Sequence, residues 1–405
     1  MFIESRRKPQ AGWVCRGIGL GSTRGYRMRV ARLSLLAAVL AAGAALAATV
    51  ASAASGVVGQ LYVNDNTTGV NTIAGFDSHS GGSLTPLAGS PFLVGGAGTG
   101  HGIGSQGALQ LSADGRYLLA VDAGSNQISV LRIKPHGDLQ LVGTPVSSNG
   151  VEPVSIAVSG DLVYVANAGS GGSNYTGFRL NAGGHLRAID NSTIALPDGS
   201  QPGDVLFSGG GRHLVGVRVA TSLIDSFTVG NDGLLTAATG SPFAAQGPGP
   251  FGSEFRPTNS SQLYVSNAHG GTNNGTVSAF SVAGDGTLSP IGSSPFPDLQ
   301  TAPCWVEISH DGHYLFTVNT ASNSISSYTI NTDGSLTLNA STPFKTAGLG
   351  GEDARLSPDG QTLWVVGTAA DNISGFTVTA GNLTELGSSP TALPAGATPF
   401  GIVTT

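Results

Sequence analysis

Short apolar stretches that end in a polar or small residue recur seven times along the chain. They repeat every 45 to 57 residues, and each is rich in Leu, Val and Tyr, which are residues typical of buried strands. We therefore predict one strand in each repeat. The seven stretches are residues 61–65, 118–122, 163–167, 214–218, 263–267, 315–319 and 363–367.

A second strand is predicted directly after each of these stretches. Its mark is an apolar residue three positions before an aromatic residue or Leu, as in Ile73 and Phe76, and a turn and a further Leu come next. The turns at 232–233, 285–286 and 333–334 are Asp-Gly pairs, which suit tight hairpins because both residue types tolerate positive φ. Each repeat therefore continues into a hairpin.

Another strand is predicted before each stretch. One of its positions is apolar in all seven repeats, and the residue type at the position directly before it varies. This alternation indicates a strand with one packed and one variable face. The variable position directly before it is occupied by Gln110, Ala157, Leu206, Glu254, Glu307, Arg355 and Ile402.

Seven repeats of four strands predict an all-β fold, a seven-bladed β-propeller over residues 54–405 with four antiparallel strands in each blade. Residues 399–404 are not followed by a strand of their own. We expect this C-terminal strand to become the innermost strand of the first blade, which closes the ring and removes a free sheet edge.

Residues 1–53 have the features of a secretory signal peptide with an upstream extension. An uncharged Ala- and Leu-rich run at 33–53 follows a basic stretch and ends in Ala51-Ser52-Ala53, a small-residue cleavage pattern. We expect the true start at Met28 and cleavage after Ala53. The alternative is an uncleaved membrane anchor, because the run is just long enough to span a bilayer. Either way we expect an extracytoplasmic protein, secreted or held in the periplasm or cell envelope.

The charge of the remaining chain excludes several classes of partner. Residues 1–53 hold eight of the 18 basic residues and one of the 24 acidic ones, so residues 54–405 carry a net charge of −13. Such a surface repels nucleic acid and anionic membranes and has few cations to hold a phosphorylated substrate. We expect a monomer that binds a small molecule or an extracellular glycan or protein.

The inner strands and the loops that lead into them carry the candidate site residues. In a propeller the inner strands line a central channel, and these loops gather on one face, here called the upper face. Carboxylates close to one another and to an Arg are expected to include one acid with a raised pKa. The candidate catalytic residues are Asp353, Glu254, Glu307 and Arg355, and the candidate substrate-binding residues are Asp122, Asp204, Arg218, Asn267, Trp305 and Glu352.

Each of these groups also has a structural interpretation. Asn267 and the equivalent Asn residues can cap the turn that follows them, and Glu254, Glu307 and Arg355 can form an ion network along the channel. Glu352, Asp353 and Asp204 offer oxygen ligands for a divalent cation, but no ligand spacing defines such a site, so we expect no cofactor and no metal.

The repeats resemble the lactonase-type seven-bladed propellers, the family of 6-phosphogluconolactonase and carboxymuconate-lactonizing enzyme. The resemblance is carried by Ser-Ala-Asp-Gly-Arg-Tyr-Leu at 112–118, Ser-Pro-Asp-Gly at 357–360, the Asp-Gly-x-Leu hairpins and Gly-Pro-Gly-Pro at 247–250. It covers essentially all of 55–405 and implies the hydrolysis or formation of a lactone.

Several positions depart from the pattern that the resemblance implies. Where family members usually carry Arg-His, Glu and Arg, this chain has Phe251-Gly252, Ala268 and Thr320. Its last inner strand begins with Gly351-Glu352-Asp353, where the family usually has Pro-Arg-Asp. Before the first Ser-x-Asp-Gly segment, Ser105 and Gly107 stand where the family has the two His residues of a His-x-His pattern.

Two hypotheses of function follow. The first is an exported lactonase that opens a neutral or cationic sugar lactone, since lactone opening needs a base for water and a donor or cation for the oxyanion. Either Asp353 or Glu254 is the base, or channel carboxylates hold a metal ion. The second is a non-catalytic propeller that binds a glycan or protein outside the cell, or an envelope protein with a structural role.

Overall fold

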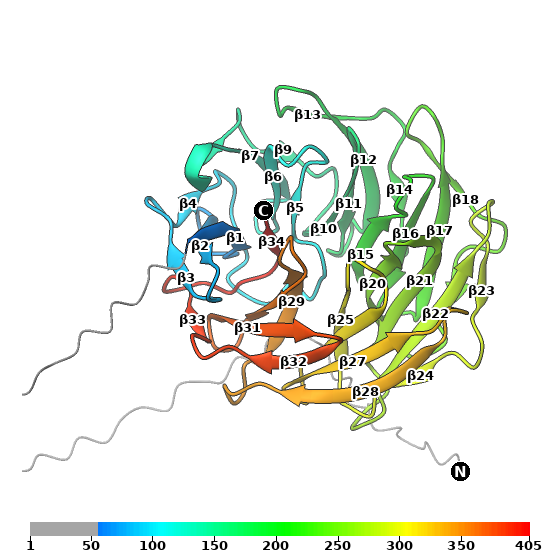
Figure 1. Cartoon of the computed structure of the whole chain (residues 1–405). Helices are drawn as coiled ribbons and strands as arrows, with labels where there is room; N and C mark the ends of the chain where they lie inside the picture. The colour runs from blue at the N-terminus through cyan, green and yellow to red at the C-terminus, as the bar shows by residue number, and fades with distance from the viewer. Residues whose placement is uncertain (1–55) are drawn as a thin grey trace, which may run out of the picture.

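The computed structural model describes residues 56–405, and these form seven β-sheets arranged as the blades of a ring (Figure 1). The predicted seven-bladed, all-β fold with four antiparallel strands in each blade is confirmed. The predicted signal peptide, residues 1–53, lies outside the described residues. Within residues 56–405, no helix is long and apolar enough to cross a membrane.

We number the blades in chain order and give their strands from the channel outward. Blade 1 is β34 (Ile402–Thr404), β1 (Val57–Asn64), β2 (Thr72–His79) and β3 (Leu84–Pro86). Blade 2 is β5 (Leu109–Leu111), β6 (Tyr117–Asp122), β7 (Gln127–Ile133) and β8 (Leu139–Leu141). Blade 3 is β10 (Pro153–Ser159), β11 (Leu162–Asn167), β12 (Asn174–Leu180) and β13 (Leu186–Ala188).

The remaining four blades repeat this order. Blade 4 is β15 (Pro202–Phe207), β16 (His213–Arg218), β17 (Leu223–Val229) and β18 (Leu235–Ala237). Blade 5 is β20 (Pro250–Arg256), β21 (Asn259–Asn267), β22 (Thr276–Val282) and β23 (Leu288–Pro290). Blade 6 is β25 (Pro303–Ile308), β26 (Tyr314–Asn319), β27 (Ser324–Ile330) and β28 (Leu336–Pro343). Blade 7 is β29 (Gly351–Leu356), β30 (Thr362–Gly367), β31 (Asn372–Thr379) and β32 (Asn382–Glu385).

Six blades add a two-residue strand that the sequence pattern does not predict. Each pairs with the third strand of its blade, whereas in blade 6 the longer β28 occupies this edge. These strands are β4 (Phe92–Leu93), β9 (Val146–Ser147), β14 (Ile194–Ala195), β19 (Phe243–Ala244), β24 (Phe296–Pro297) and β33 (Thr391–Ala392). A 3₁₀ turn at Pro135–Gly137 is the one helical element among the described residues.

The C-terminal strand closes the ring as predicted. β34 pairs antiparallel with β1, and Val403 lies opposite Tyr62. The equivalent pairs in blades 5 to 7 set Glu254, Glu307 and Arg355 opposite the corresponding residues of their second strands. Val403 therefore stands at the level of Glu254. The prediction that Ile402 occupies this level is wrong by one residue, because no turn follows the last strand to fix its alignment with the other repeats.

Tyrosines of the second strands join neighbouring blades. The Tyr62 hydroxyl donates to the carbonyl of Gly137 at 2.7 Å, and Tyr164 donates to Gly233 at 2.8 Å. In both cases the acceptor belongs to a hairpin turn of the next blade. These links explain why Tyr and turn Gly recur together in the repeats, since a buried hydroxyl and a buried carbonyl both need a partner.

Candidate active site

The innermost strand of a blade presents a row of backbone N–H groups to the channel, and side chains of the preceding blade accept hydrogen bonds from them. Asp204 of blade 4 accepts from the Ser253 N–H at 3.0 Å and from the Ser253 hydroxyl at 2.7 Å. Glu307 of blade 6 accepts from the Leu356 N–H at 2.8 Å. These polar side chains of the inner strands therefore hold neighbouring blades together at the channel.

Four carboxylates surround one guanidinium in the channel. Arg355 Nη1 lies 3.3 Å from Glu307 Oε2, and the negative charges of Asp353, Glu254 and Asp204 also act on Arg355 and, with Glu307, raise its pKa. Asp204, Glu307 and Asp353 are at most 4% exposed, and the Glu254 Oε2 atom is inaccessible to solvent. The predicted catalytic residues thus come together, with Asp204 added to them.

Burial raises the pKa of every acid in this cluster. The pKa of Asp204 rises to about 7 and that of Asp353 to about 6, although hydrogen bonds from Ser253 and the charge of Arg355 oppose the effect. Burial and the neighbouring Glu307 raise the pKa of Glu254 well above its ordinary value. Since a low-dielectric site disfavours several adjacent negative charges, the acids compete for one cation.

Two atoms of this cluster have unused hydrogen-bonding capacity. Glu254 Oε2 and Arg355 Nε are buried and have no hydrogen-bond partner within residues 56–405. Asp353 differs, because its Oδ2 accepts from the Gly107 N–H at 3.2 Å and its Oδ1 from the Ala354 N–H at 3.0 Å. Because the Glu254 and Arg355 atoms are inaccessible to solvent, a ligand reaches them only when the two side chains shift, but no existing hydrogen bond of these atoms has to break. Both oxygens of Asp353 already accept hydrogen bonds.

Residues 102–107, here called the plug, cross the channel above this cluster. The Trp305 indole donates to the Ser105 carbonyl at 2.8 Å, and the Gln106 N–H donates to the Gly203 carbonyl at 2.9 Å. The Gln106 amide also donates to the Ser253 carbonyl and accepts from the Val306 N–H, both at 3.0 Å. The plug is thus held by blades 4, 5, 6 and, through Gly107 and Asp353, 7.

A cavity of about 190 Å³ lies below the plug, and we call it the channel cavity. Glu254, Arg355 and Gln106 line it together, and it reaches the opposite rim of the channel at Ala113, which is exposed. It is smaller than the roughly 300–1,000 Å³ typical of sites for drug-sized ligands, so it suits a ligand of about one ring. Its other lining residues are Gln110, Leu111, Ile156, Ala157, Val158, Asp204, Val205, Leu206, Phe207 and Ser253.

A shallow hollow of about 40 Å³ lies on the upper face, above the plug. Glu152, Gln201 and His269 line it together with Phe251, whose ring packs edge-to-face on Trp305 at 5.2 Å between centroids. Trp305 is itself fully buried. It therefore supports the plug from the channel wall, and the acid cluster faces away from the upper side.

Three predicted substrate-binding residues lie elsewhere and do not line the channel cavity of the described structure. Arg218 makes two hydrogen bonds to Asp225, at 2.7 and 2.5 Å. Asp122 accepts from the side chains of Asn71 and Ser129, and Asn267 donates to the Thr276 and Ser278 hydroxyls. Their side chains hold the blades in shape. Asn267 bonds to hydroxyls of the neighbouring strand β22, and its Oδ1 has no partner within residues 56–405, so it does not cap the following turn as the structural interpretation expected.

Glu352 is buried beside Asp353, and its Oε2 has no partner among residues 56–405. In the part of the chain that the structure describes, no three His, Cys, Asp or Glu side chains form a group that suits a metal ion. Both oxygens of Asp353 accept backbone N–H bonds.

Sequence reasoning missed Gln106 as a site residue. The connection into blade 2 spans residues 94–108, whereas the one into blade 3 spans 148–152. An insertion at this point of a repeat is the signal that was available, because the connections into the inner strands gather at the mouth of the channel.

Comparison with solved structures shows the same fold. A candidate 6-phosphogluconolactonase from Bacteroides uniformis is 20% identical, covers 86% of this chain and 99% of its own, and has a TM-score of 0.69. One from Bacteroides fragilis is 22% identical, with 86% and 98% covered and a TM-score of 0.67. A periplasmic gluconolactonase from Pseudomonas aeruginosa is 18% identical, with 86% and 99% covered and a TM-score of 0.68.

A search of curated proteins found no match to this chain. The model of the lactonase family of seven-bladed β-propellers matches residues 70–207 and 254–399, which is more than half of the chain. The resemblance inferred from the repeats is confirmed, and the chain belongs to this lactonase family.

Proposed function

We propose that this protein is an exported hydrolase of a small, uncharged sugar-type lactone, with Glu254 as the base and Arg355 as the group that stabilises the oxyanion. The observation that carries the proposal is the pair of unpartnered polar atoms, Glu254 Oε2 and Arg355 Nε, on residues that line one channel cavity. A base and a cation are the two groups that lactone opening requires.

The reaction begins when Glu254 removes a proton from a water molecule as its oxygen attacks the lactone carbonyl. The carbonyl oxygen gains negative charge, and the guanidinium of Arg355 stabilises it. The bond from the carbonyl carbon to the ring oxygen then breaks, and the ring oxygen receives the proton from Glu254. One lactone and one water give one hydroxy acid, and the carboxyl group returns to its starting state.

The charge of the cavity supports an uncharged substrate. Asp204, Glu254, Glu307 and Asp353 are balanced by Arg355 alone, and Arg355 already lies beside Glu307. A phosphate or carboxylate on the ligand would meet several buried acids without a free cation to pair with it. A neutral polyhydroxylated ring avoids this cost.

Gly252 supports a site that differs from the usual family pattern. A Cβ at this position would lie 2.2 Å from Gln106 Oε1 and 2.7 Å from the Cys304 carbonyl oxygen. A His side chain, which family members usually carry here, has no room beside the plug. The presence of Gly252 and of Gln106 beside it therefore belong together.

Export is supported by the sequence at 33–53 and by the periplasmic gluconolactonase among the similar folds. The same neighbour supports glucono-1,5-lactone as the first substrate to try. The cell location can be checked by fractionating cells that express the chain from Met28 and by finding the N-terminal residue of the mature protein, for which we expect Ala54.

The function is tested by following acid release from D-glucono-1,5-lactone at constant pH, with and without a chelator. We expect hydrolysis above background, unchanged by the chelator, and a loss of at least 100-fold in Glu254→Gln. Glu152→Gln is the matched control, because Glu152 lies in the hollow above the plug. Purified, folded protein with no rate above background would overturn the proposal and favour a non-catalytic binding protein.

A further inference from the structure

A second cavity adjoins the channel cavity. It is a groove of about 400 Å³ between blades 2 and 3, and we call it the blade 2–3 groove. Ala113 lines both the groove and the channel cavity, so one exposed residue of the lower rim stands between the two spaces. The groove is lined by Ser112, Ala113, Asp114, Arg116, Tyr117, Gly160, Asp161, Leu180, Asn181 and Ala182.

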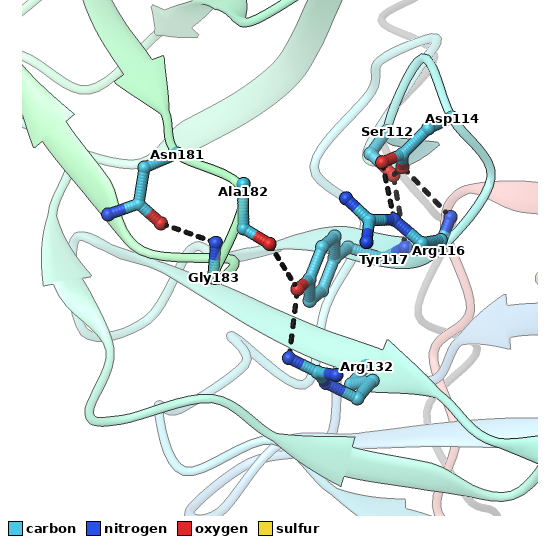
Figure 2. A network of polar contacts seen from close by, with 8 residues as sticks. All are labelled: Ser112, Asp114, Arg116, Tyr117, Arg132, Asn181, Ala182 and Gly183. Atoms are coloured by element: carbon cyan, nitrogen blue, oxygen red, sulfur yellow. Dashed lines mark hydrogen bonds and ion pairs between the residues drawn. The ribbon is translucent and has the colours of Figure 1, made fainter.

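Tyr117 forms the structural centre of this groove (Figure 2). Its hydroxyl donates to the Ala182 carbonyl and accepts from Arg132 Nη2, both at 3.0 Å. The Arg116 guanidinium lies 5.7 Å from the ring centroid, and its Nε donates to Asp114 Oδ2 at 2.6 Å. These contacts tie the turn of blade 2 to the hairpin of blade 3, so the groove is held in shape without a ligand.

The groove is polar and close to neutral. Asp114 pairs with Arg116, and Asp161 pairs with Arg179 at 2.7 Å. Ser112 and Asn181 add a hydroxyl and an amide. Paired charges next to uncharged donors and acceptors match the hydroxyl groups of a sugar ring. An ionic ligand fits less well, because the charged side chains that would pair with it are already paired with one another.

The plug directs access to this side of the molecule. It closes the channel above Glu254 and Arg355 through hydrogen bonds to Trp305 and Ser253. The channel cavity reaches solvent at the lower rim, where Ala113 is exposed. A ligand that enters the channel cavity therefore passes the end of the blade 2–3 groove.

We propose that the blade 2–3 groove is an outer subsite that binds the second sugar ring of a disaccharide-type lactone while the lactone ring occupies the channel cavity. The inference rests on the proposed function for the reaction, but the binding itself does not need catalysis. It names the substrate class as a glycosylated aldonolactone, such as maltobiono-1,5-lactone.

An equivalent groove between blades 4 and 5 provides a matched control. Its volume is about 130 Å³, and Ser208, Arg212 and His213 occupy the repeat positions of Ser112, Arg116 and Tyr117. Its lining residues in the described structure include none from the channel cavity. Arg212 is exposed like Arg116 but does not adjoin the site.

The experiment compares kcat/KM for maltobiono-1,5-lactone and D-glucono-1,5-lactone. We expect the wild-type protein to prefer the disaccharide lactone, and Arg116→Ala to lower this preference about tenfold, the effect of losing a hydrogen bond to a charged group. Arg212→Ala leaves the preference unchanged. Ala113→Trp, at an exposed turn position, lowers kcat/KM for both lactones at least tenfold because it blocks the rim.

A second readout does not depend on catalysis. Calorimetric titration with two neutral analogues, maltobiono-1,5-lactam and D-glucono-1,5-lactam, should show tighter binding of the disaccharide lactam. This preference should be lost in Arg116→Ala and kept in Arg212→Ala. Equal binding of both lactams, or an equal effect of Arg116→Ala and Arg212→Ala, overturns the outer subsite. If no lactone is hydrolysed while the disaccharide lactam is still preferred, the proposed reaction fails and the subsite stands.

Discussion

The carboxylate of Glu307, on the inner strand of blade 6, lies 3.3 Å from the guanidinium of Arg355 on the inner strand of blade 7. The other Glu307 oxygen accepts the N–H of Leu356, the residue after Arg355. One carboxylate thus neutralises a buried cation and satisfies a buried backbone donor of the same strand. The pair joins two blades at the level of the proposed base, Glu254.

Removing the cation from this pair should be costly. Arg355→Met leaves Glu307 and Glu254 buried without a positive partner, so we expect the free energy of unfolding to fall by about 3–5 kcal/mol. Glu307→Gln should cost less, because the amide oxygen can still accept from Leu356. Urea unfolding at pH 7 measures both. An Arg355→Met variant as stable as the wild type would show that the pair does not stabilise the ring.

The buried acids predict a protein that is more stable in mild acid than in mild base. Burial raises the pKa of Asp204 and of Asp65 to about 7 in the folded state, above the value near 4 of an unfolded chain. The folded state therefore binds more protons between these values, and stability falls as pH rises from about 4 to 7. We expect a higher Tm at pH 5 than at pH 8.

Asp204→Asn is the variant that isolates this effect. The amide keeps an acceptor for Ser253 but does not titrate, so the decline in Tm between pH 5 and pH 8 should become smaller. A wild-type Tm that rises over this range would contradict the assignment of raised pKa values to the buried acids.

Gly252 should be intolerant of even one added carbon. Gly252→Ala places a Cβ against Gln106 and the Cys304 carbonyl, so we expect a loss of about 1–3 kcal/mol as the plug is displaced. Gly284→Ala is the control, because a Cβ there would have no atom of the other described residues within 4 Å. Denaturant unfolding compares the two, and equal stability of both variants would show that the plug does not constrain Gly252.

The repeats made the architecture predictable. Seven copies of one strand pattern gave the blade number and the closing strand, and the alternation of packed and variable positions placed Glu254, Glu307 and Arg355 at one level of the channel. The closing strand was misaligned by one residue because Val403 and Ile402 are both apolar. Only the pairing with Tyr62 distinguishes them.

The plug was not predictable from the repeats, because the connection at residues 94–108 is longer than the corresponding connections into the other inner strands. Asp122, Arg218 and Asn267 stand at the ends of second strands. Arg218 finds its partner, Asp225, on the next strand of the same blade, whereas Asp122 also accepts from Asn71 of blade 1. A residue pattern along one strand does not reveal which cross-strand neighbour uses a side chain.

The proposed base predicts a distinctive pH dependence of the reaction. Glu254 acts when it is ionised, and burial and Glu307 raise its pKa above the usual range. Activity should therefore be lost as pH falls through this raised pKa, well above 4.5. The measurement is kcat/KM for glucono-1,5-lactone against pH, with spontaneous hydrolysis subtracted. A flat profile from pH 4.5 to 7.5 would exclude Glu254 as the base.

The most direct measurement is a crystal structure of the protein with D-glucono-1,5-lactam, a stable analogue of the lactone. Our account predicts the analogue in the channel cavity below Gln106, with its carbonyl oxygen toward Arg355 and the reacting carbon facing Glu254. An analogue bound instead in the hollow beside Glu152 and His269, above the plug, would contradict the account.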